Sequence, residues 1–212
     1  TMARENLSKR ALELVPSPTL LILNRERELR AKGVQVISLA VGEADWNVCD
    51  GAKNEAKKAI ESNLSRYSPV PGLPELRELI KEDVYNQIGV EYQYTDVCVT
   101  AGAKLTIQSA LQILCNEMDE VIFPSPFWVS YPSMIKLAGA LPKPIQCDES
   151  TFKITPEVLE KSITKKTKVL IFCSPNNPTG TVYSLKELKG IAGVLKKHPN
   201  LTIISDDIYS RI

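Results

Sequence analysis

From residue 96 onward, short apolar runs alternate with longer stretches in which apolar residues recur at helical spacing. The short runs predict strands and the longer stretches predict helices. Such alternation is typical of βαβ crossovers, so we expect an α/β domain with a mainly parallel sheet and helices on both faces. The predicted strands cover residues 97–100, 120–123, 144–147, 168–173 and 201–205.

Helices are predicted between these strands over residues 104–115 and 129–138. Two further helices have explicit starting signals. Thr155 precedes Pro156, an N-cap followed by proline at the first helical position. Ser184 and Glu187 have the spacing of a capping box.

The first hundred residues predict helices over 20–32, 52–62 and 74–88. In the last of these, several apolar residues recur at helical spacing, so we expect one face of the helix to pack on a core. These residues are Leu76, Leu79, Ile80, Val84 and Ile88.

Charge and composition exclude several classes of protein. The 26 Lys and Arg residues balance 25 Asp and Glu residues, so the net charge of +1 argues against binding to nucleic acid or to an anionic membrane. The single histidine, His198, lies in a predicted turn. This argues against a catalytic Ser-His pair and against a metal site built from several histidines, so we predict no metal.

The five cysteines are odd in number and form no CxxC pair. Most lie in apolar runs such as Val97-Cys98-Val99, so we expect reduced thiols in the core of a cytoplasmic protein. No apolar run approaches the roughly 20 residues that span a bilayer.

Candidate chemistry gathers where the predicted parallel strands end. The loop Ser174-Pro175-Asn176-Asn177-Pro178-Thr179-Gly180 follows one strand, and its prolines restrain the backbone beside Asn177. The alternative is a plain strand-to-helix loop. The next strand ends at Asp206 with Tyr209 close behind, although a carboxylate there is often solvated or caps a helix.

Two other loops reach the same predicted edge. Thr100-Ala101-Gly102-Ala103-Lys104 leads into a helix whose N-terminal N–H groups suit a phosphate, although many strand-to-helix turns look alike. Pro124-Ser125-Pro126-Phe127-Trp128 offers an aromatic plane, with core packing as the alternative. Phosphate cradle, aromatic plane, amide, carboxylate and phenol together describe a pocket for a phosphorylated aromatic heterocycle.

The chain resembles the fold-type I aminotransferases, closest to the bacterial-type aspartate aminotransferases. The resemblance extends over essentially the whole sequence and rests on an ordered set of motifs. They are Val41-Gly42-Glu43-Ala44-Asp45, Tyr67-Ser68-Pro69-Val70-Pro71-Gly72, Ala101-Gly102-Ala103-Lys104, Pro126-Phe127-Trp128-Val129-Ser130-Tyr131-Pro132, Ser174-Pro175-Asn176-Asn177-Pro178-Thr179-Gly180 and Ser205-Asp206-Asp207-Ile208-Tyr209.

The resemblance implies pyridoxal 5'-phosphate (PLP) as cofactor and assigns its contacts by position. Gly102, Ala103 and Lys104 supply the phosphate-binding backbone, and Trp128 stacks on the pyridine ring. Asn177 and Tyr209 bind the ring hydroxyl, and Asp206 pairs with the ring nitrogen. Tyr67 reaches the phosphate of the partner subunit's cofactor, which implies a homodimer with shared active sites. Asp206 and Tyr209 are the implied catalytic residues.

The resemblance further implies amino transfer from an L-amino acid, expected to be aspartate or glutamate, to a 2-oxo acid. Lys104 and Thr19 match positions that receive the distal carboxylate, with a solvated surface lysine as the alternative for Lys104. Gly42 and Asn177 complete the implied substrate site. Ala44, Cys49 and Pro71 depart from the usual residues of the family, which affects the expected fine specificity and not the fold.

No lysine of this sequence matches the Schiff-base lysine of the family. Lys9 and Lys186 come shortly after serines, but neither has the flanking pattern that the family shows. We therefore expect a sequence cut short, with residues 1–50 as N-terminal arm and part of a small domain and residues 51–212 as an incomplete large domain. This chain alone is expected to be inactive and not a well-behaved monomer, with gaps in strand order. Alternatives are a non-catalytic protein of this fold that dimerises or binds a partner, and an aromatic or kynurenine aminotransferase or an aminocyclopropane-carboxylate synthase. The resemblance also predicts cis peptide bonds at Ser125-Pro126 and Asn177-Pro178.

Overall fold

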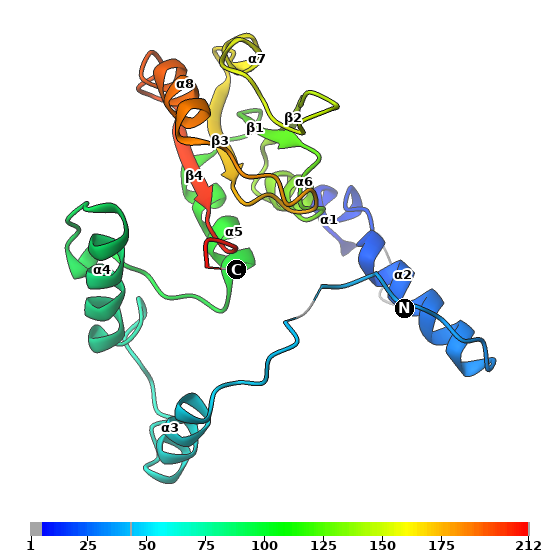
Figure 1. Ribbon diagram of the computed structural model, residues 1–212, viewed down its shortest axis with the longest axis vertical. Coiled ribbons are helices and arrows are strands. Elements are labelled where there is room, and N and C mark those ends of the chain that lie inside the picture. The colour runs from blue at the N-terminus through cyan, green and yellow to red at the C-terminus, as the bar shows by residue number, and fades with distance from the viewer. Residues whose placement is uncertain (1–5, 43, 212) are drawn as a thin grey trace. The chain divides into compact units, whose positions relative to one another are not determined.

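The computed structural model describes residues 6–42 and 44–211, so Glu43 of the first motif lies outside the described residues (Figure 1). The chain forms two compact units, one of Thr1–Leu21 with Gly102–Ile212 and the other of Ile22–Ala101. Each unit is described by itself.

The first unit is built on a parallel sheet with strand order β2-β1-β3-β4. The strands are β1 (Glu120–Ser125), β2 (Leu141–Gln146), β3 (Thr167–Cys173) and β4 (Thr202–Asp206). Four of the five predicted strands are therefore confirmed, with β2 beginning three residues earlier than predicted. The register pairs Cys173 with Asp206, so β3 and β4 end side by side.

Helices cover both faces of this sheet, as predicted. They are α5 (Ala103–Leu114), α6 (Tyr131–Leu137), α7 (Pro156–Ser162) and α8 (Leu185–Leu195), with the short α1 (Lys9–Leu12) beside α6. Thr155 caps α7 by accepting from the N–H of Val158, and Ser184 and Glu187 form the predicted capping box of α8. Both predicted starting signals are confirmed.

Alternating strand residues divide the core between the two faces. Val121 and Phe123 of β1 pack with α5 and α6, whereas Ile122 between them packs with α7 and α8. β3 repeats the pattern, with Ile171 on the first face and Leu170 on the second. A strand buried on both faces reads as a continuous apolar run, which is why β1 and β3 were recognisable in the sequence.

The described residues of the second unit form helices and no sheet. Its elements are α3 (Asp50–Glu61), α4 (Pro74–Ile88) and the 3₁₀-helix η2 (Tyr94–Asp96), and α2 (Pro18–Ala31) runs from the first unit into it. The three helices predicted here are confirmed. Leu20, Leu21 and Ile22 of α2 are exposed, and Leu23 is half-buried.

The expected buried face of α4 is a wrong prediction. Leu76, Leu79 and Ile88 are exposed, Leu79 to 63%, and Ile80 and Val84 are only half-buried. The buried residue of the helix is Arg77. Arg77 donates from Nε to the carbonyl of Val97 at 2.8 Å, and its guanidinium lies over the Tyr94 ring. Within its unit, α4 packs mainly against the three-residue η2, which is too little surface to cover an apolar stripe.

The strand predicted over residues 97–100 is not formed. The backbone is extended at Val97, and Val99 donates to the carbonyl of Pro71 at 2.9 Å, but the segment belongs to no ladder among the described residues. A strand requires a neighbouring strand for its backbone groups, and β-propensity alone does not supply one. The expected gap in strand order is not found among the described residues, because the four strands pair in one continuous order, β2-β1-β3-β4.

Both predicted cis peptide bonds are confirmed. The peptide bonds Ser125-Pro126 and Asn177-Pro178 are cis, as predicted, and Ser174-Pro175 is a third cis bond that was not predicted.

The five cysteines are free, but only Cys115, Cys147 and Cys173 are buried. Cys49 and Cys98 are exposed, which corrects the expectation of core thiols for these two. Both lie in the second unit, where the structure describes no sheet that could cover them.

Candidate functional site

A cavity of about 300 Å³ lies where β3 and β4 end and α5 begins. Figure 1 shows the chain leaving β4 next to the start of α5. Carboxyl ends of parallel strands are the usual place for ligands in α/β proteins, because the helices and loops that follow open a crevice there. The cavity is lined by Gly102, Ala103, Lys104, Trp128, Tyr131, Cys173, Asn177, Asp206, Ile208 and Tyr209.

Asp206 is the buried carboxylate of this cavity, with 8% of its surface exposed. It is the last residue of β4, and its Oδ2 accepts a hydrogen bond from the Tyr131 hydroxyl at 2.6 Å. Burial raises the pKa of the Tyr131 phenol, and the hydrogen bond to Asp206 raises it further. Tyr131 therefore remains a neutral donor that orients the Asp206 carboxylate.

Cys173 lies at the end of β3 beside Asp206. Burial raises the pKa of its thiol, and the nearby Asp206 charge acts in the same direction. The thiol donates a hydrogen bond to the carbonyl oxygen of Pro175, which lies 3.1 Å from Sγ. A protonated, buried thiol is a packing group, so Cys173 contributes an apolar wall.

Asn177 and Tyr209 meet although they come from different loops. The Asn177 side-chain amide donates to the Tyr209 hydroxyl at 2.9 Å. Asn177 follows β3 and Tyr209 follows β4, and the neighbouring ends of these strands bring the two loops together. The pair places an amide and a phenol on one side of the cavity, as the sequence predicted.

Trp128 forms an aromatic wall that is held from two sides. Its ring packs edge-on against Tyr131 with centroids 5.5 Å apart, and the Lys104 ammonium lies 5.1 Å from its centroid. Its neighbour Phe127 instead packs edge-on against Phe123 of the core at 4.8 Å. Both aromatic residues pack against the core, and of the two only Trp128 also lines the cavity.

The N-terminus of α5 supplies the polar end of the cavity. Gly102 is its N-cap residue and makes no side-chain cap, so the first N–H groups of the helix are not closed off by a capping side chain. Gly102 has φ +88°, a left-handed conformation that favours glycine. The helix dipole adds partial positive charge at this end, so the cavity suits an anion there.

Three predicted site residues are not among those that line the cavity. Thr19 lies in the first turn of α2, and Gly42 and Tyr67 belong to the second unit. The Tyr67 side chain is fully exposed. Their roles stay predictions.

Sequence reasoning assigned no role to Tyr131, Cys173 or Ile208, which also line the cavity. A signal existed for Tyr131, because the motif containing Trp128 includes it one helical turn further on. Its partnership with Asp206 joins residues 75 positions apart, which no local pattern reveals.

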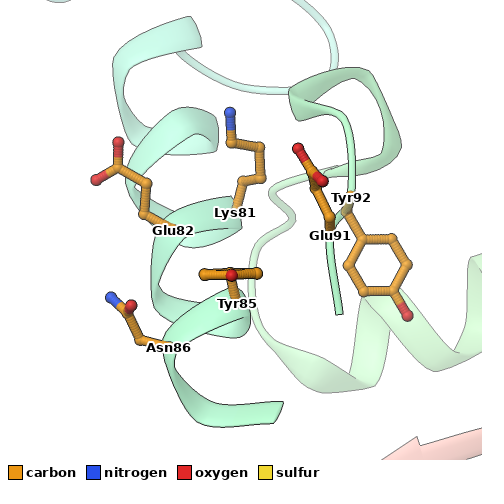
Figure 2. Close-up of a pocket in the computed structure, with 6 residues that line it drawn as sticks. All are labelled: Lys81, Glu82, Tyr85, Asn86, Glu91 and Tyr92. Atoms are coloured by element: carbon orange, nitrogen blue, oxygen red, sulfur yellow. The ribbon is translucent and has the colours of Figure 1, made fainter. Parts of the chain in front are cut away.

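The second unit has a more open hollow of about 420 Å³ beside α4 (Figure 2). Lys81, Glu82, Tyr85 and Asn86 on α4 line it together with Glu91 and Tyr92. Lys81 is engaged by Glu78 at 2.6 Å, and this contact raises the pKa of the Lys81 ammonium. None of the predicted site residues lies there.

The described residues contain no group of three or more His, Cys, Asp and Glu side chains that could hold a metal ion. Among the same residues, no helix has both the length and the apolar character required to cross a membrane.

Comparison with known proteins identifies the family. The family model described as aminotransferase class I and II matches residues 34–212. The probable aspartate/prephenate aminotransferase of Rickettsia felis is 40% identical over 207 residues, which are 97% of this chain and 51% of that protein. The crystal structure of the aspartate aminotransferase from Rhizobium meliloti matches with a TM-score of 0.92 and 32% identity, over 96% of this chain and 51% of that one.

The aspartate aminotransferase from Thermus thermophilus with maleate matches with a TM-score of 0.91 and 35% identity, over 96% of this chain and 53% of that one. The chain thus spans about half the length of these relatives. Family model, sequence identity and fold agree with the resemblance on which the sequence prediction rested, and the chain belongs to the class I and II aminotransferase family.

Proposed function

We propose that the cavity at the ends of β3 and β4 holds PLP and that the protein acts as a PLP-dependent aminotransferase. The observation that carries the proposal is the convergence of five features in one cavity. They are a helix N-terminus, an aromatic wall, an amide, a phenol and a buried carboxylate.

The donor set of the cavity fits the chemistry of PLP, which combines a phosphate with a flat pyridine ring bearing a hydroxyl. The N-terminus of α5 suits the phosphate, and the Trp128 ring suits a stacked heterocycle. Asn177 and Tyr209 suit the ring hydroxyl because their side chains already meet at 2.9 Å.

Asp206 has the central role in this proposal. Its buried carboxylate accepts a hydrogen bond from the protonated ring nitrogen and holds the proton there, while Tyr131 fixes the carboxylate from the other side. A charge-assisted hydrogen bond of this kind contributes about 1.5–3 kcal/mol. When bound, PLP supplies an electron sink that makes loss of the α-proton of an amino acid feasible.

An acidic amino acid, aspartate or glutamate, is the proposed amino donor, with a 2-oxo acid as acceptor. Lys104 supports this proposal because it lines the cavity and its ammonium lies over Trp128. The Thermus thermophilus relative carries maleate, a dicarboxylate, and the Rickettsia felis relative is named for aspartate and prephenate. Thr19, Gly42 and Asn177 are the other proposed substrate contacts.

A homodimer is the proposed assembly, with Tyr67 contributing to the partner's site. The full exposure of the Tyr67 side chain supports a contact outside its own unit. A cytoplasmic location is proposed from the free cysteines, of which two are exposed thiols.

The test is amino transfer by the protein at its natural length after reconstitution with PLP. We expect oxaloacetate to form from aspartate and 2-oxoglutarate, and expect none without PLP. PLP binding without amino transfer to any 2-oxo acid would favour a non-catalytic protein of this fold. Transfer from aromatic amino acids alone would favour the aromatic or kynurenine class.

A further inference from the structure

Asn176, the neighbour of Asn177, does not line the cavity but joins two of the loops that do. Its side-chain Nδ2 donates to the carbonyl of Pro126 at 3.2 Å and to the hydroxyl of Thr179 at 2.9 Å. Pro126 lies two residues before Trp128, whereas Thr179 lies in the loop that carries Asn177.

The backbone of Asn176 is anchored as well. Its N–H donates to the carbonyl of Thr181 at 3.0 Å, and its carbonyl accepts from the N–H of Gly180 at 2.8 Å. The residue is therefore fixed within its own loop, so its side chain transmits the position of this loop to the loop of Trp128. Among the hydrogen bonds described for residues 174–180, the Asn176–Pro126 bond is the side-chain link to residues 124–128.

We propose that Asn176 is a positioning residue that sets the separation between the Trp128 ring and the Asn177–Tyr209 pair. The inference rests on the proposed function, because these groups flank the proposed cofactor. A flat ring must meet the stacking face and the hydroxyl contacts together, so a shift of either loop loses both.

The chemistry of the two acceptors provides a selective test. The carbonyl of Pro126 only accepts, whereas the Thr179 hydroxyl both donates and accepts. Asn176→Asp keeps the shape but loses the donor, so the bond to Pro126 is broken while Thr179 turns and donates to the new carboxylate. Thr179→Val removes the other bond, together with the one that the Thr181 N–H donates to the Thr179 hydroxyl at 3.2 Å, and leaves the link to Pro126 intact.

The experiment uses the protein at its natural length with Trp128 as the single tryptophan, which requires Trp46→Phe in this chain and replacement of any tryptophan beyond it. In the cofactor-free form, we expect Asn176→Asp to shift Trp128 emission to the red and to raise its quenching by acrylamide. Thr179→Val is expected to leave both unchanged. Asn200→Asp, the same change in an exposed turn, is the matched control.

PLP titration, followed by quenching of Trp128, is the second measurement. We expect Asn176→Asp to bind PLP about tenfold more weakly, the loss for roughly one hydrogen bond. Asn177→Asp is expected to weaken PLP binding without altering the emission or the acrylamide quenching of Trp128 in the cofactor-free form. This difference distinguishes Asn177, a residue that contacts the cofactor, from Asn176, a residue that positions other groups.

Trp128 emission and quenching in Asn176→Asp equal to those of Asn200→Asp would overturn the proposal. If Asn176→Asp does not unfold cooperatively, Asn176→Ser takes its place, because its neutral hydroxyl is too short to reach Pro126. Failure of the unsubstituted protein to bind PLP would refute the proposed function, while the cofactor-free measurement would still decide the role of Asn176.

Discussion

Adjacent carboxylates at the end of β4 have opposite surroundings. Asp206 is buried and accepts from Tyr131, whereas Asp207 is exposed and accepts from the hydroxyl of Ser205 at 2.9 Å. If the protein has the proposed function, Asp206→Asn should lower kcat/KM for amino transfer by roughly 10- to 150-fold, because the ring nitrogen of PLP would lose its ionic partner. Asp207→Asn should change kcat/KM by less than about threefold, since a solvated charge contributes little. Comparable losses in the two variants would contradict the assignment.

Lys104 is a proposed substrate contact, and its ammonium also lies over the Trp128 ring. If its ammonium receives the distal carboxylate, Lys104→Ala should lower kcat/KM for aspartate and glutamate by roughly 10- to 150-fold, the loss of one charge-assisted contact. Transfer from an apolar or aromatic amino acid should be spared. Equal losses on all amino acids would instead assign Lys104 to the cofactor or, through its contact with Trp128, to the wall of the cavity.

At the scale of elements, α8 contains two glycines with different surroundings. A Cβ on Gly190 would lie 2.9 Å from Cγ of Pro156, the stiff first residue of α7, whereas a Cβ on Gly193 would meet nothing within 4 Å. We predict that Gly190→Ala destabilises the protein by about 1–2 kcal/mol, because overpacking outweighs helix propensity. Gly193→Ala should stabilise it by about 0.5–1 kcal/mol. Urea unfolding of both variants checks this, and stabilisation by both would show that α7 and α8 are not packed this closely.

The capping box at the start of α8 makes the stability of the folded protein depend on pH. The backbone N–H of Ser184 is the largest cause that lowers the pKa of Glu187 to about 2, followed by the Ser184 hydroxyl and the Lys153 ammonium at 3.0 Å. Because the folded pKa lies below the ordinary value of 4.5, Glu187 stabilises the folded state fully above that pH. This contribution is lost as the pH falls toward 2.

Glu187→Gln should therefore lower stability at neutral pH, and its difference from the unsubstituted protein should shrink between pH 4.5 and 2. Urea unfolding at several pH values, with Glu149→Gln as a control on a surface loop, measures the effect. A difference that does not vary with pH would show that the Glu187 charge is not involved.

For the whole molecule, the proposed shared active sites can be tested by mixing subunits. Asp206→Asn and Tyr67→Ala should each reduce activity in separate preparations. In a mixed dimer, one site combines the intact Asp206 of one subunit with the intact Tyr67 of its partner. We predict that refolding the two variants together restores activity above the sum of the separate preparations. No restoration, with mixed dimers demonstrated by differential tags, would assign Tyr67 to its own subunit's site or to none.

Local patterns were sufficient for most elements of the first unit. The doubly buried strands β1 and β3, the Thr155 cap and the Ser184–Glu187 capping box depend on neighbours within a few residues, so periodicity and cap chemistry reveal them. Asn177, Asp206 and Tyr209 were recognisable because each follows a strand end, and parallel strands end at a common edge.

Packing against distant residues decided what those patterns left open. Residues 97–100 have a strand-like sequence but no ladder, and the apolar stripe of α4 stays exposed while Arg77 is buried. The hydrogen-bond partners Tyr131 and Asp206 are 75 positions apart, and the Asn176–Pro126 link spans 50. The sequence by itself determined the helices, four of the five predicted strands and the loops that reach the cavity, since these depend on local spacing. Only the tertiary structure decided which faces are buried and which side chains hold the site together, because burial and hydrogen bonding require a partner that the chain places from far away.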